Sequence, residues 1–311
     1  MEKPQRLVFG ETLVELGEEN ERIVVLDADV SSSTQTKHFA ARFPERFFNF
    51  GVAEANMVSA AAGFATGGHV PFVSTFAFLI ALRAGDQVRA QVAYPRLNVK
   101  LMGGYAGLSD FADGASHQSV EDLAVMRAMP NMTVVVPSDV TETQMALRAA
   151  AEMEGPVYVR LSRAEVDREF GPDHPFRIGK GIRLRDGDDV TLIGCGPMLK
   201  MALEAAERLA EDGIDARVLD MHTLKPLDVD LIERAAEETG AIVTVEEHNV
   251  LGGLGGAVCE AVCETRPVPV LRCGIADRFG ESGPYPEILQ RAGLHVDRVV
   301  QLARRAVEGG S

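Results

Sequence analysis

The chain has 311 residues, which is enough for two domains with separate hydrophobic cores. Hydrophobic residues make up 46% and charged residues 25%, as is typical of a globular protein. The net charge of −15 argues against nucleic-acid binding, because a phosphate-binding surface needs an excess of basic residues. No apolar run reaches the length of a membrane span, and the N-terminus lacks an apolar leader. We therefore expect no membrane association and a cytoplasmic location.

The first half of the chain alternates short β-branched runs with helical segments. Strands are predicted at 23–26, 71–75, 98–102, 133–136 and 157–161. Helices are predicted to begin at residue 54, at about residue 119 and at about residue 140, and a further helix is predicted to end at residue 94. Strands that alternate with helices of ten or more residues predict a parallel, doubly wound sheet.

The segment Asn49–Met57 is the most informative part of this half. It places Glu54 at the start of a run of small and apolar residues, Ala55–Ala65, which predicts a buried helix that allows close approach of another backbone. A carboxylate at that position meets unpaired backbone N–H groups and the positive end of the helix dipole. Glu54 is therefore either an ordinary N-terminal helix residue or a group held to exchange a proton with a ligand.

Residues 165–180 lose this periodicity and carry prolines, a glycine and several charges, which predicts an interdomain linker. We expect one domain at 1–164 and a second at 181–311. The second half contains predicted strands at 190–193, 216–219, 241–246 and 268–272, with helices at 197–209, from 228, from 252 and at 297–305. It is therefore predicted to be another α/β domain.

A glycine-rich segment, Leu251–Ala257, follows a predicted strand and opens a helix. It is similar to a dinucleotide-binding loop, but Val258 stands where that motif needs its third glycine. Glycines that permit tight helix packing or a subunit contact are the favoured interpretation.

Four cysteines all lie in the last part of the chain, at positions 195, 259, 263 and 273. Cys259 and Cys263 share a helix face, and we expect them to be small buried hydrophobic residues. Neither their spacing nor that of the histidines predicts a metal site in this chain.

Ligands of open parallel sheets bind outside the carboxyl ends of the strands. The segments 27–33, 74–78, 103–117, 137–139 and 162–163 all follow predicted strands. Strand polarity therefore predicts that these segments lie along one rim.

Three blocks then suggest a family. Phe50–Met57, Pro71–Phe76 and Asp113–Gln118 resemble the C-terminal half of transketolase, and more closely the separate C-terminal, pyrimidine-binding subunit of split bacterial and archaeal transketolases. The similarity runs from about Arg6 to Val299, with the blocks in the family's order. It implies two doubly wound domains, one that binds the pyrimidine of thiamine diphosphate and one like the transketolase C-terminal domain.

The resemblance implies specific contacts to the cofactor. It assigns Glu54 to a hydrogen bond with a nitrogen of the aminopyrimidine ring, a task for which a dry and apolar setting is expected. It assigns Phe76 to packing against that ring, with Phe78 beside it, and Asp29 to a place near the thiazolium. On sequence alone, Phe76 could equally be a core residue and Asp29 a turn or helix cap.

The resemblance also implies a substrate site. Arg163 corresponds to an arginine that clamps the phosphate of a sugar phosphate. Arg6, Ser33 and His117 correspond to further contacts with that phosphate, and His117 is counted with Glu54 among the catalytic residues. Asp113 corresponds to an acid that binds a sugar hydroxyl.

Tyr105 departs from the family pattern. Many split transketolases carry a substrate-binding histidine at this position, and a phenol cannot take its positive charge although it can donate a hydrogen bond. We therefore expect two-carbon ketol transfer with an altered, unusual ketose substrate.

The chain contains no Gly-Asp-Gly, the segment that implies a diphosphate and Mg²⁺ site. We expect an N-terminal transketolase subunit to supply that half of the active site and its Mg²⁺, Ca²⁺ or Mn²⁺. The predicted assembly is α₂β₂, and the chain alone is expected to be inactive.

Two alternatives stay open. One is the E1 β-subunit of a 2-oxo acid dehydrogenase, which shares cofactor geometry and domain order. The other is a non-catalytic assembly subunit. Arg163 and Ser33 favour a sugar phosphate over an oxo acid.

Overall fold

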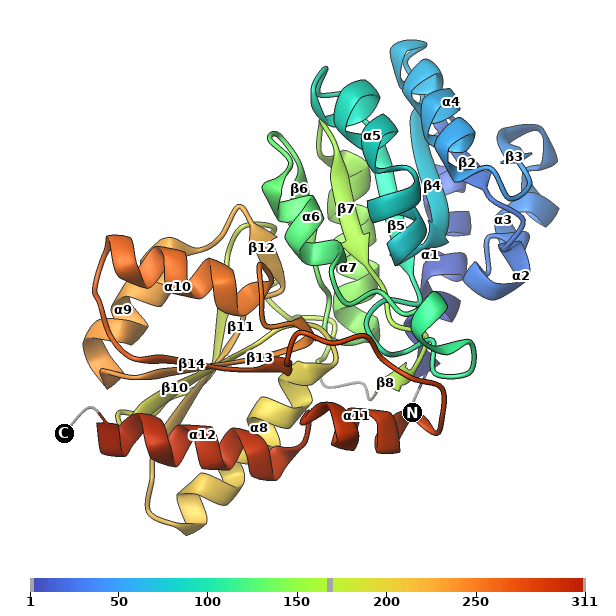
Figure 1. The fold of residues 1–311 in the computed structure, drawn as a ribbon. Helices are drawn as coiled ribbons and strands as arrows, with labels where there is room; N and C mark the ends of the chain where they lie inside the picture. Colours follow the sequence, from blue (N-terminus) through green and yellow to red (C-terminus); the bar gives the residue numbers. More distant parts are fainter. Residues whose placement is uncertain (1–2, 167–169, 310–311) are drawn as a thin grey trace.

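The computed structural model describes residues 3–166 and 170–309, which form two α/β units packed against each other (Figure 1). The first unit, blue to green in Figure 1, lies at the upper right, and the second, mostly orange to red, at the lower left. Within the described residues, no helix combines the length and hydrophobicity that crossing a bilayer requires.

The first unit is built on a seven-stranded sheet in the order β12-β6-β7-β5-β4-β2-β3. Its strands are β2 (Ile23–Asp27), β3 (Phe47–Asn49), β4 (Val70–Phe76), β5 (Lys100–Gly104), β6 (Thr133–Val135), β7 (Val157–Arg160) and β12 (Thr223–Lys225). Every neighbouring pair is parallel except β12 with β6. The predicted doubly wound fold is confirmed.

Helices cover both faces of this sheet. The α-helices are α1 (Gln5–Glu19), α2 (Ser31–Thr34), α3 (Lys37–Arg42), α4 (Glu54–Thr66), α5 (Gly85–Gln87), α6 (Asp122–Ala128) and α7 (Val140–Glu152). Two 3-10 helices, η1 (Pro44–Arg46) and η4 (Gly114–Ser116), and two π-helices, η2 (Leu79–Arg83) and η3 (Val88–Ala93), accompany them. Alternate residues of a strand face opposite sides. Accordingly, Ile23 and Val25 of β2 pack with α1, α3 and α7, while Val24 and Leu26 pack with α4 and α6.

The second unit has a five-stranded sheet in the order β14-β13-β10-β11-β9. Its strands are β9 (Ile182–Arg185), β10 (Val190–Gly194), β11 (Ala216–Asp220), β13 (Ile242–Asn249) and β14 (Val270–Ile275), and its helices are α8 (Met198–Glu211), α9 (Val229–Thr239), α10 (Leu254–Glu264), α11 (Tyr285–Ala292) and α12 (Val296–Gly309). Only β9 is antiparallel to its neighbour.

The two units share structure across their boundary. β12 lies after β11 in the chain, yet it pairs with β6 of the first sheet. Val134 and Val136 of the first unit belong to the same buried cluster as Leu219 and Met221 of the second. A continuous core therefore holds the units together.

The sequence predictions omitted several elements, among them α1, β9 and α11. α1 contains two glycines, which disfavour a helix interior. They are there for packing: a Cβ on Gly17 would lie 2.6 Å from Cε2 of Phe39, and one on Gly10 would lie 2.7 Å from the carbonyl oxygen of Gln35. Tertiary contact thus overrides helix propensity.

The predicted linker at 165–180 lies partly outside the described residues, at 167–169. Before that gap, β8 (Glu165–Val166) pairs with β1 (Lys3–Pro4). Residues 170–180 contain no helix or strand.

The helix predicted at Glu54 forms, but only one face of it is buried in this chain. Met57, Val58 and Ala61 lie in the core, whereas Asn56 and Gly63 are exposed. The prediction of a buried helix was therefore wrong for the chain by itself, because α4 leaves one face exposed.

The cysteine prediction was also partly wrong. Cys263 is exposed and Cys259 is half-buried, whereas Cys195 and Cys273 are buried. The cause is geometric: the buried side of α10 is formed by residues such as Ala257, Val258 and Ala261.

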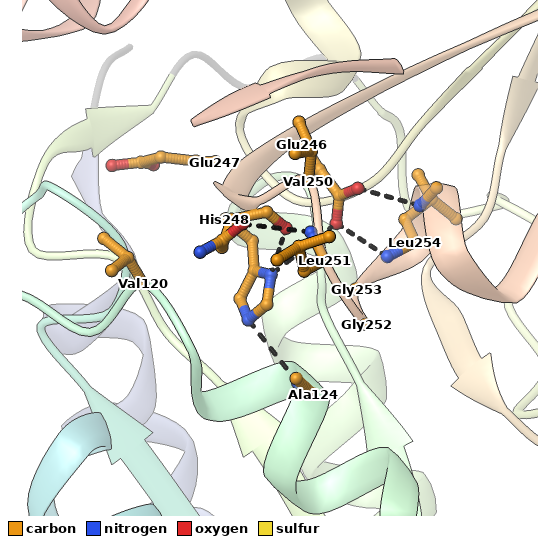
Figure 2. A network of polar contacts seen from close by, with 12 residues as sticks. Val120, Ala124, Glu246, Glu247, His248, Val250, Leu251, Gly252, Gly253 and Leu254 are labelled. Atoms are coloured by element: carbon orange, nitrogen blue, oxygen red, sulfur yellow. Dashed lines mark hydrogen bonds and ion pairs between the residues drawn. The ribbon is translucent and has the colours of Figure 1, made fainter. Parts of the chain in front are cut away.

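The glycines before α10 do serve close packing, as the sequence indicated. A Cβ on Gly252 would lie 2.6 Å from Cβ of Ala124. The N-terminus of α10 is occupied by the chain itself, because Glu246 accepts hydrogen bonds from Leu254 N (2.6 Å) and Gly255 N (2.8 Å) (Figure 2).

Candidate active site

The predicted site residues follow adjacent strands of the first sheet. β7, β5, β4 and β2 are neighbours and run parallel, so their carboxyl ends meet at one rim. Phe76 is the last residue of β4, Tyr105 follows β5, and Arg163 lies shortly after β7. Strand polarity therefore brings these side chains together.

An aromatic cluster forms the centre of this rim. Phe76 and Tyr105 pack with their ring centroids 4.5 Å apart and a tilt of 32°. Leu79 is buried with them, and Phe78 packs against the group. The ring of His117 stands edge-on, 6.0 Å from Phe76 and 5.7 Å from Phe78. We call Phe76, Phe78, Leu79, Tyr105 and His117 the aromatic cluster.

Tyr105 is held in an uncommon backbone conformation, with φ of +58°. Its hydroxyl lies 3.4 Å from the carbonyl oxygen of Ser33. Arg6 donates to the same carbonyl at 3.3 Å and approaches the Tyr105 hydroxyl at 3.5 Å. Ser33 therefore contributes its carbonyl oxygen to these contacts.

Arg163 is already paired in this structure. Its Nη1 donates to Oδ1 of Asp110 at 2.6 Å, and its guanidinium lies over the rings of Tyr105 (5.1 Å) and Phe111 (4.8 Å). Burial, followed by the nearby charge of Asp113, raises the pKa of Asp110 to about 6. Near neutral pH the Asp110 carboxylate is therefore paired with Arg163, the residue that the resemblance assigns to a phosphate.

Asp113 is exposed and lies beside Asp110, so both acids belong to the loop that also carries His117. Ser116 Oγ lies 2.9 Å from Nδ1 of His117 and so fixes the imidazole from one side. This loop therefore presents two acids and one imidazole at the rim.

Glu54 is the first residue of α4, with only 1% of its side chain exposed. Its two carboxylate oxygens lie 3.3 and 3.2 Å from Nη1 of Arg83, at the end of η2. η2 is a π-helix, a form that often occurs at functional sites, and its first residue is Leu79 of the aromatic cluster. The setting of Glu54 is therefore buried but not apolar, since it contains an ion pair.

Asp29 is exposed at the end of β2 and has a φ of +65°. Asn49 holds it on both sides: Asp29 N donates to Asn49 Oδ1, and Asn49 Nδ2 donates to Asp29 Oδ1, each at 3.1 Å. Its neighbour Asp27 is buried and accepts from Val30 N at 2.7 Å and from Thr36 Oγ1 at 2.8 Å. Asp27 therefore takes the structural role, and the carboxylate of Asp29 faces outward.

Glu247 connects the second unit to the loop of the site. Its Oε1 accepts from Leu108 N at 2.7 Å, and its Oε2 accepts from the hydroxyl of Tyr285 at 2.9 Å. Figure 2 shows that Glu247 and His248 point from β13 toward the first unit. Behind them, buried Arg160 donates to the carbonyl oxygen of Glu247 at 3.0 Å and pairs with Asp122 at 2.8 Å.

Comparison with known families agrees with this geometry. The model of the transketolase pyrimidine-binding domain matches residues 2–168, and that of the transketolase C-terminal domain matches residues 179–299. The chain belongs to the transketolase family. This is a family of thiamine-diphosphate-dependent transferases.

Individual relatives place the chain more closely within the transketolases. It is 47% identical over 309 residues to a protein of Methanocaldococcus jannaschii named as a transketolase C-terminal section, covering 98% of this chain and 96% of that protein. It is 41% identical over 303 residues to the 6-deoxy-6-sulfo-D-fructose transketolase subunit SqwH of Clostridium sp. (strain MSTE9), covering 97% and 94%. A solved structure described as a split gene transketolase, an inactive β4 tetramer, superposes with a TM-score of 0.91 at 48% identity and covers 99% of each chain.

These comparisons support a two-subunit transketolase-like role and give no support to the dehydrogenase or scaffold alternatives. The sequence analysis did not find Arg83, Asp110 or Glu247. Asp110 could have been suspected as a second acid in the substrate loop, three residues before Asp113. Arg83 and Glu247 gave no comparable signal, because their partners lie 29 and 139 residues away.

Proposed function

We propose that this chain is the pyrimidine-binding and C-terminal subunit of a two-subunit transketolase that transfers a two-carbon ketol unit through thiamine diphosphate. The observation that carries the proposal is a buried carboxylate, Glu54, at the start of α4 and connected through η2 to the aromatic cluster. The proposed domains are 1–164 and 181–311, joined by a linker at 165–180.

The residues present fit the aminopyrimidine half of the cofactor. A heterocycle needs one flat apolar surface and a few directed polar groups, and Phe76 with Tyr105 supplies the surface. The buried hydroxyls of Ser74 and Thr75, at the end of β4, have no hydrogen-bond partner in the described chain. Glu54 would hold a ring nitrogen, Phe76 and Phe78 would pack on the ring, and Asp29 would face the thiazolium side.

Bound thiamine diphosphate would supply the carbanion chemistry that ketol transfer requires. The work of this chain is to hold and move a proton at the Glu54 carboxylate, for which its position at a helix N-terminus and its burial are suitable. His117 stands at the open edge of the aromatic cluster, where it can exchange a proton with a substrate hydroxyl.

The proposed substrate is a ketose with an anionic end, and Asp110 modulates the binding of that end to Arg163. Arg163, Arg6, Ser33 and His117 would bind the anionic end, and Asp113 a hydroxyl. In this structure Asp110 competes for Arg163. Tyr105 brings a phenol where many relatives have an imidazole, so the proposed donor is an unusual ketose, phosphorylated or carrying another anion.

A partner subunit would complete the site. The sequence contains no Gly-Asp-Gly, so an N-terminal subunit would hold the diphosphate and its Mg²⁺, with Ca²⁺ or Mn²⁺ as substitutes. Large apolar side chains are exposed just before α4, within η2 and just after η3: Val52 (72%), Leu82 (48%) and Tyr94 (84%). Such a surface suits a subunit contact. The proposed assembly is α₂β₂. The chain alone would be inactive, as is the β4 tetramer of the similar split gene transketolase.

Co-expression with the candidate N-terminal subunit tests the proposal. The complex should cleave a ketose donor and transfer two carbons to an aldose, whereas each subunit alone should not. A screen of ketose phosphates against 2-oxo acids separates transketolase from dehydrogenase chemistry. Full turnover by this chain without a partner would refute the split-subunit proposal.

The location we propose is the cytoplasm. The four cysteines are all free in the structure, which suits a reducing compartment.

A further inference from the structure

A second cluster of titratable side chains lies away from the proposed active site, at the junction of the two units. Glu142 comes from α7, His174 from the segment between the units, and Asp220 from the end of β11. One ligand atom from each of the three lies within 4.8 Å of the others. None of these residues takes part in the aromatic cluster or the Arg163 contacts, so the cluster needs its own explanation.

The three side chains are withdrawn from solvent. Only 5% of the His174 side chain and 0% of the Glu142 side chain are exposed, and Asp220 is 0% exposed. Nε2 of His174 lies 3.0 Å from Oε1 of Glu142. Two carboxylates this close repel each other unless a cation or a proton lies between them.

Two buried polar atoms in this region are left without a hydrogen-bond partner within the described chain. They are Oδ2 of Asp220 and Nε2 of His222, a residue that is also 0% exposed. His222 interacts electrostatically with both Glu142 and His174, so it lies beside the cluster. Buried polar atoms are normally paired, and the Asp220 carboxyl here meets that of Glu142, so a proton or a cation must lie between the two acids.

The candidate ligands are also held in place from behind, as metal ligands usually are. Oε2 of Glu142 accepts from Ser138 N at 2.8 Å, and Ser138 Oγ donates to Oδ1 of Asp220 at 3.2 Å. The ring of His174 stacks on Phe170, with centroids 3.8 Å apart. The ring of His222 stacks on Phe176 in the same way at 4.2 Å.

We propose that Glu142, His174 and Asp220 form a binding site for a divalent transition metal, with Zn²⁺ as the best fit and Mn²⁺ next. An imidazole nitrogen with two carboxylate oxygens suits these ions, whereas Mg²⁺ prefers oxygen ligands and water. Tetrahedral zinc places its ligand atoms about 3.3 Å apart, given bonds of about 2.0–2.1 Å. The His174–Glu142 pair, at 3.0 Å, is near this spacing, and Asp220 must approach by about 1.5 Å at most. A water molecule can take the fourth place.

The metal has a structural role in this proposal. It ties α7, the segment after residue 170 and β11 together, and these elements belong to the first unit, the connection and the second unit. It therefore fixes the angle between the two units without touching the reacting groups.

Metal binding to the 311-residue chain tests the proposal. The chain, produced without a polyhistidine tag and stripped with EDTA, is titrated with Zn²⁺ and separately with Mn²⁺ by calorimetry, and its thermal midpoint is measured with and without each metal. One equivalent of zinc per chain should bind and raise the midpoint by about 2–4 °C. Asp220→Asn should weaken the affinity by about 10-fold or more and abolish the shift.

The design allows for folding defects and surface binding. Asn has nearly the same size and shape as Asp, so it fits the buried position of Asp220 and the variant should fold. His174→Gln is the second variant, since it lies outside regular secondary structure. His69→Gln removes an exposed imidazole and should bind zinc as the wild type does. The absence of stoichiometric binding by the wild type, or equal binding by a folded Asp220→Asn or His174→Gln chain, would overturn the proposal.

Discussion

Glu247 in the second unit accepts a hydrogen bond from the backbone N–H of Leu108 in the first, with 2.7 Å between Oε1 and the nitrogen. Leu108 belongs to the loop that follows β5 and runs from Tyr105 to His117. The approach is close: a Cβ on Gly107 would lie 2.6 Å from the carboxyl carbon of Glu247. The C-terminal unit therefore fixes the start of the substrate loop.

Glu247→Ala should loosen this loop. The change leaves Leu108 N and the Tyr285 hydroxyl without their acceptor and should cost about 1–3 kcal/mol of stability. In the assembled enzyme, KM for the ketose should rise more than kcat falls. Glu247→Gln is the matched control, because its oxygen can still accept from Leu108 N and its amide can donate to the oxygen of Tyr285. Steady-state kinetics with thermal unfolding measure both effects, and an unchanged KM in a destabilised Ala variant would assign Glu247 a purely structural role.

The stability of the chain should fall as pH rises through neutrality. Burial raises the pKa of Glu247 to about 7, from an ordinary value of 4.5, and that of Glu246 likewise to about 7. A carboxyl whose pKa is raised in the folded state binds its proton more tightly there than when unfolded. Its stabilising contribution is complete below about pH 4.5 and is lost as pH rises through about 7.

Denaturant unfolding of Glu247→Gln between pH 5 and 8 tests this linkage. Over that range the free energy of unfolding should fall by roughly 1–3 kcal/mol less in the variant than in the wild type. Glu246 should account for part of the pH dependence that remains. Parallel curves for the two proteins would show that Glu247 does not titrate in this window.

Asp110 should control anion binding at Arg163. Above about pH 6 the Asp110 carboxylate is charged and holds the guanidinium, whereas below that pH it is neutral and the arginine is released. Asp110→Asn should therefore lower KM for a phosphorylated ketose by about 10-fold at pH 8, which corresponds to about 1.4 kcal/mol.

The pH profile separates this effect from a change in packing. For the wild type, KM should fall as pH drops through about 6, and Asp110→Asn should flatten that part of the profile. Asp113→Asn leaves the ion pair of Asp110 with Arg163 in place but removes a charge that raises the pKa of Asp110, so it should keep the fall in KM and move it to lower pH. A wild-type KM that rises on acidification would contradict the prediction.

Glu54→Gln in the complex should reduce the rate by about 10²–10⁴-fold, because an amide cannot exchange the proton. Arg83 allows a sharper test, because its guanidinium contacts both oxygens that the cofactor would need. Since 52% of the Arg83 side chain is exposed, the ion pair is worth at most about 1 kcal/mol.

Arg83→Gln should consequently change stability little and tighten thiamine diphosphate binding to the complex by severalfold. Fluorescence or calorimetric titration of the cofactor measures this. Arg89→Gln, on the neighbouring η3, is a matched control for the loss of one positive charge. Weaker cofactor binding in Arg83→Gln alone would show that the arginine assists the cofactor instead of competing with it.

Much of this architecture could be predicted because it depends on local patterns. The β-branched runs at β2 and β4 and the helix at Glu54 come from periodicity, and the rim comes from strand polarity alone. Phe76, Tyr105 and Arg163 therefore lay close together as expected.

The rest depends on contacts distant in the chain. Nothing near residue 223 indicates that β12 joins the other unit's sheet. The pairing of Asp110 with Arg163 depends on two loops that meet only after β5 and β7 align. α1 was not predicted, and its two glycines, which disfavour a helix interior, are needed for packing against Gln35 and Phe39.

Tyr105 should determine which ketose the enzyme accepts. Its ring stacks on Phe76 and under Arg163, and its hydroxyl reaches the Ser33 carbonyl at 3.4 Å. Tyr105→His would introduce a second donor that can carry a charge, and histidine is among the residues that tolerate a positive φ. We expect kcat/KM for xylulose 5-phosphate to rise by about 10-fold, which corresponds to about 1.4 kcal/mol of transition-state binding. Tyr105→Phe keeps the stack and loses only the hydroxyl, so it should not gain this activity. Wild-type turnover of xylulose 5-phosphate at the rate of the His variant would show that the phenol does not restrict the substrate.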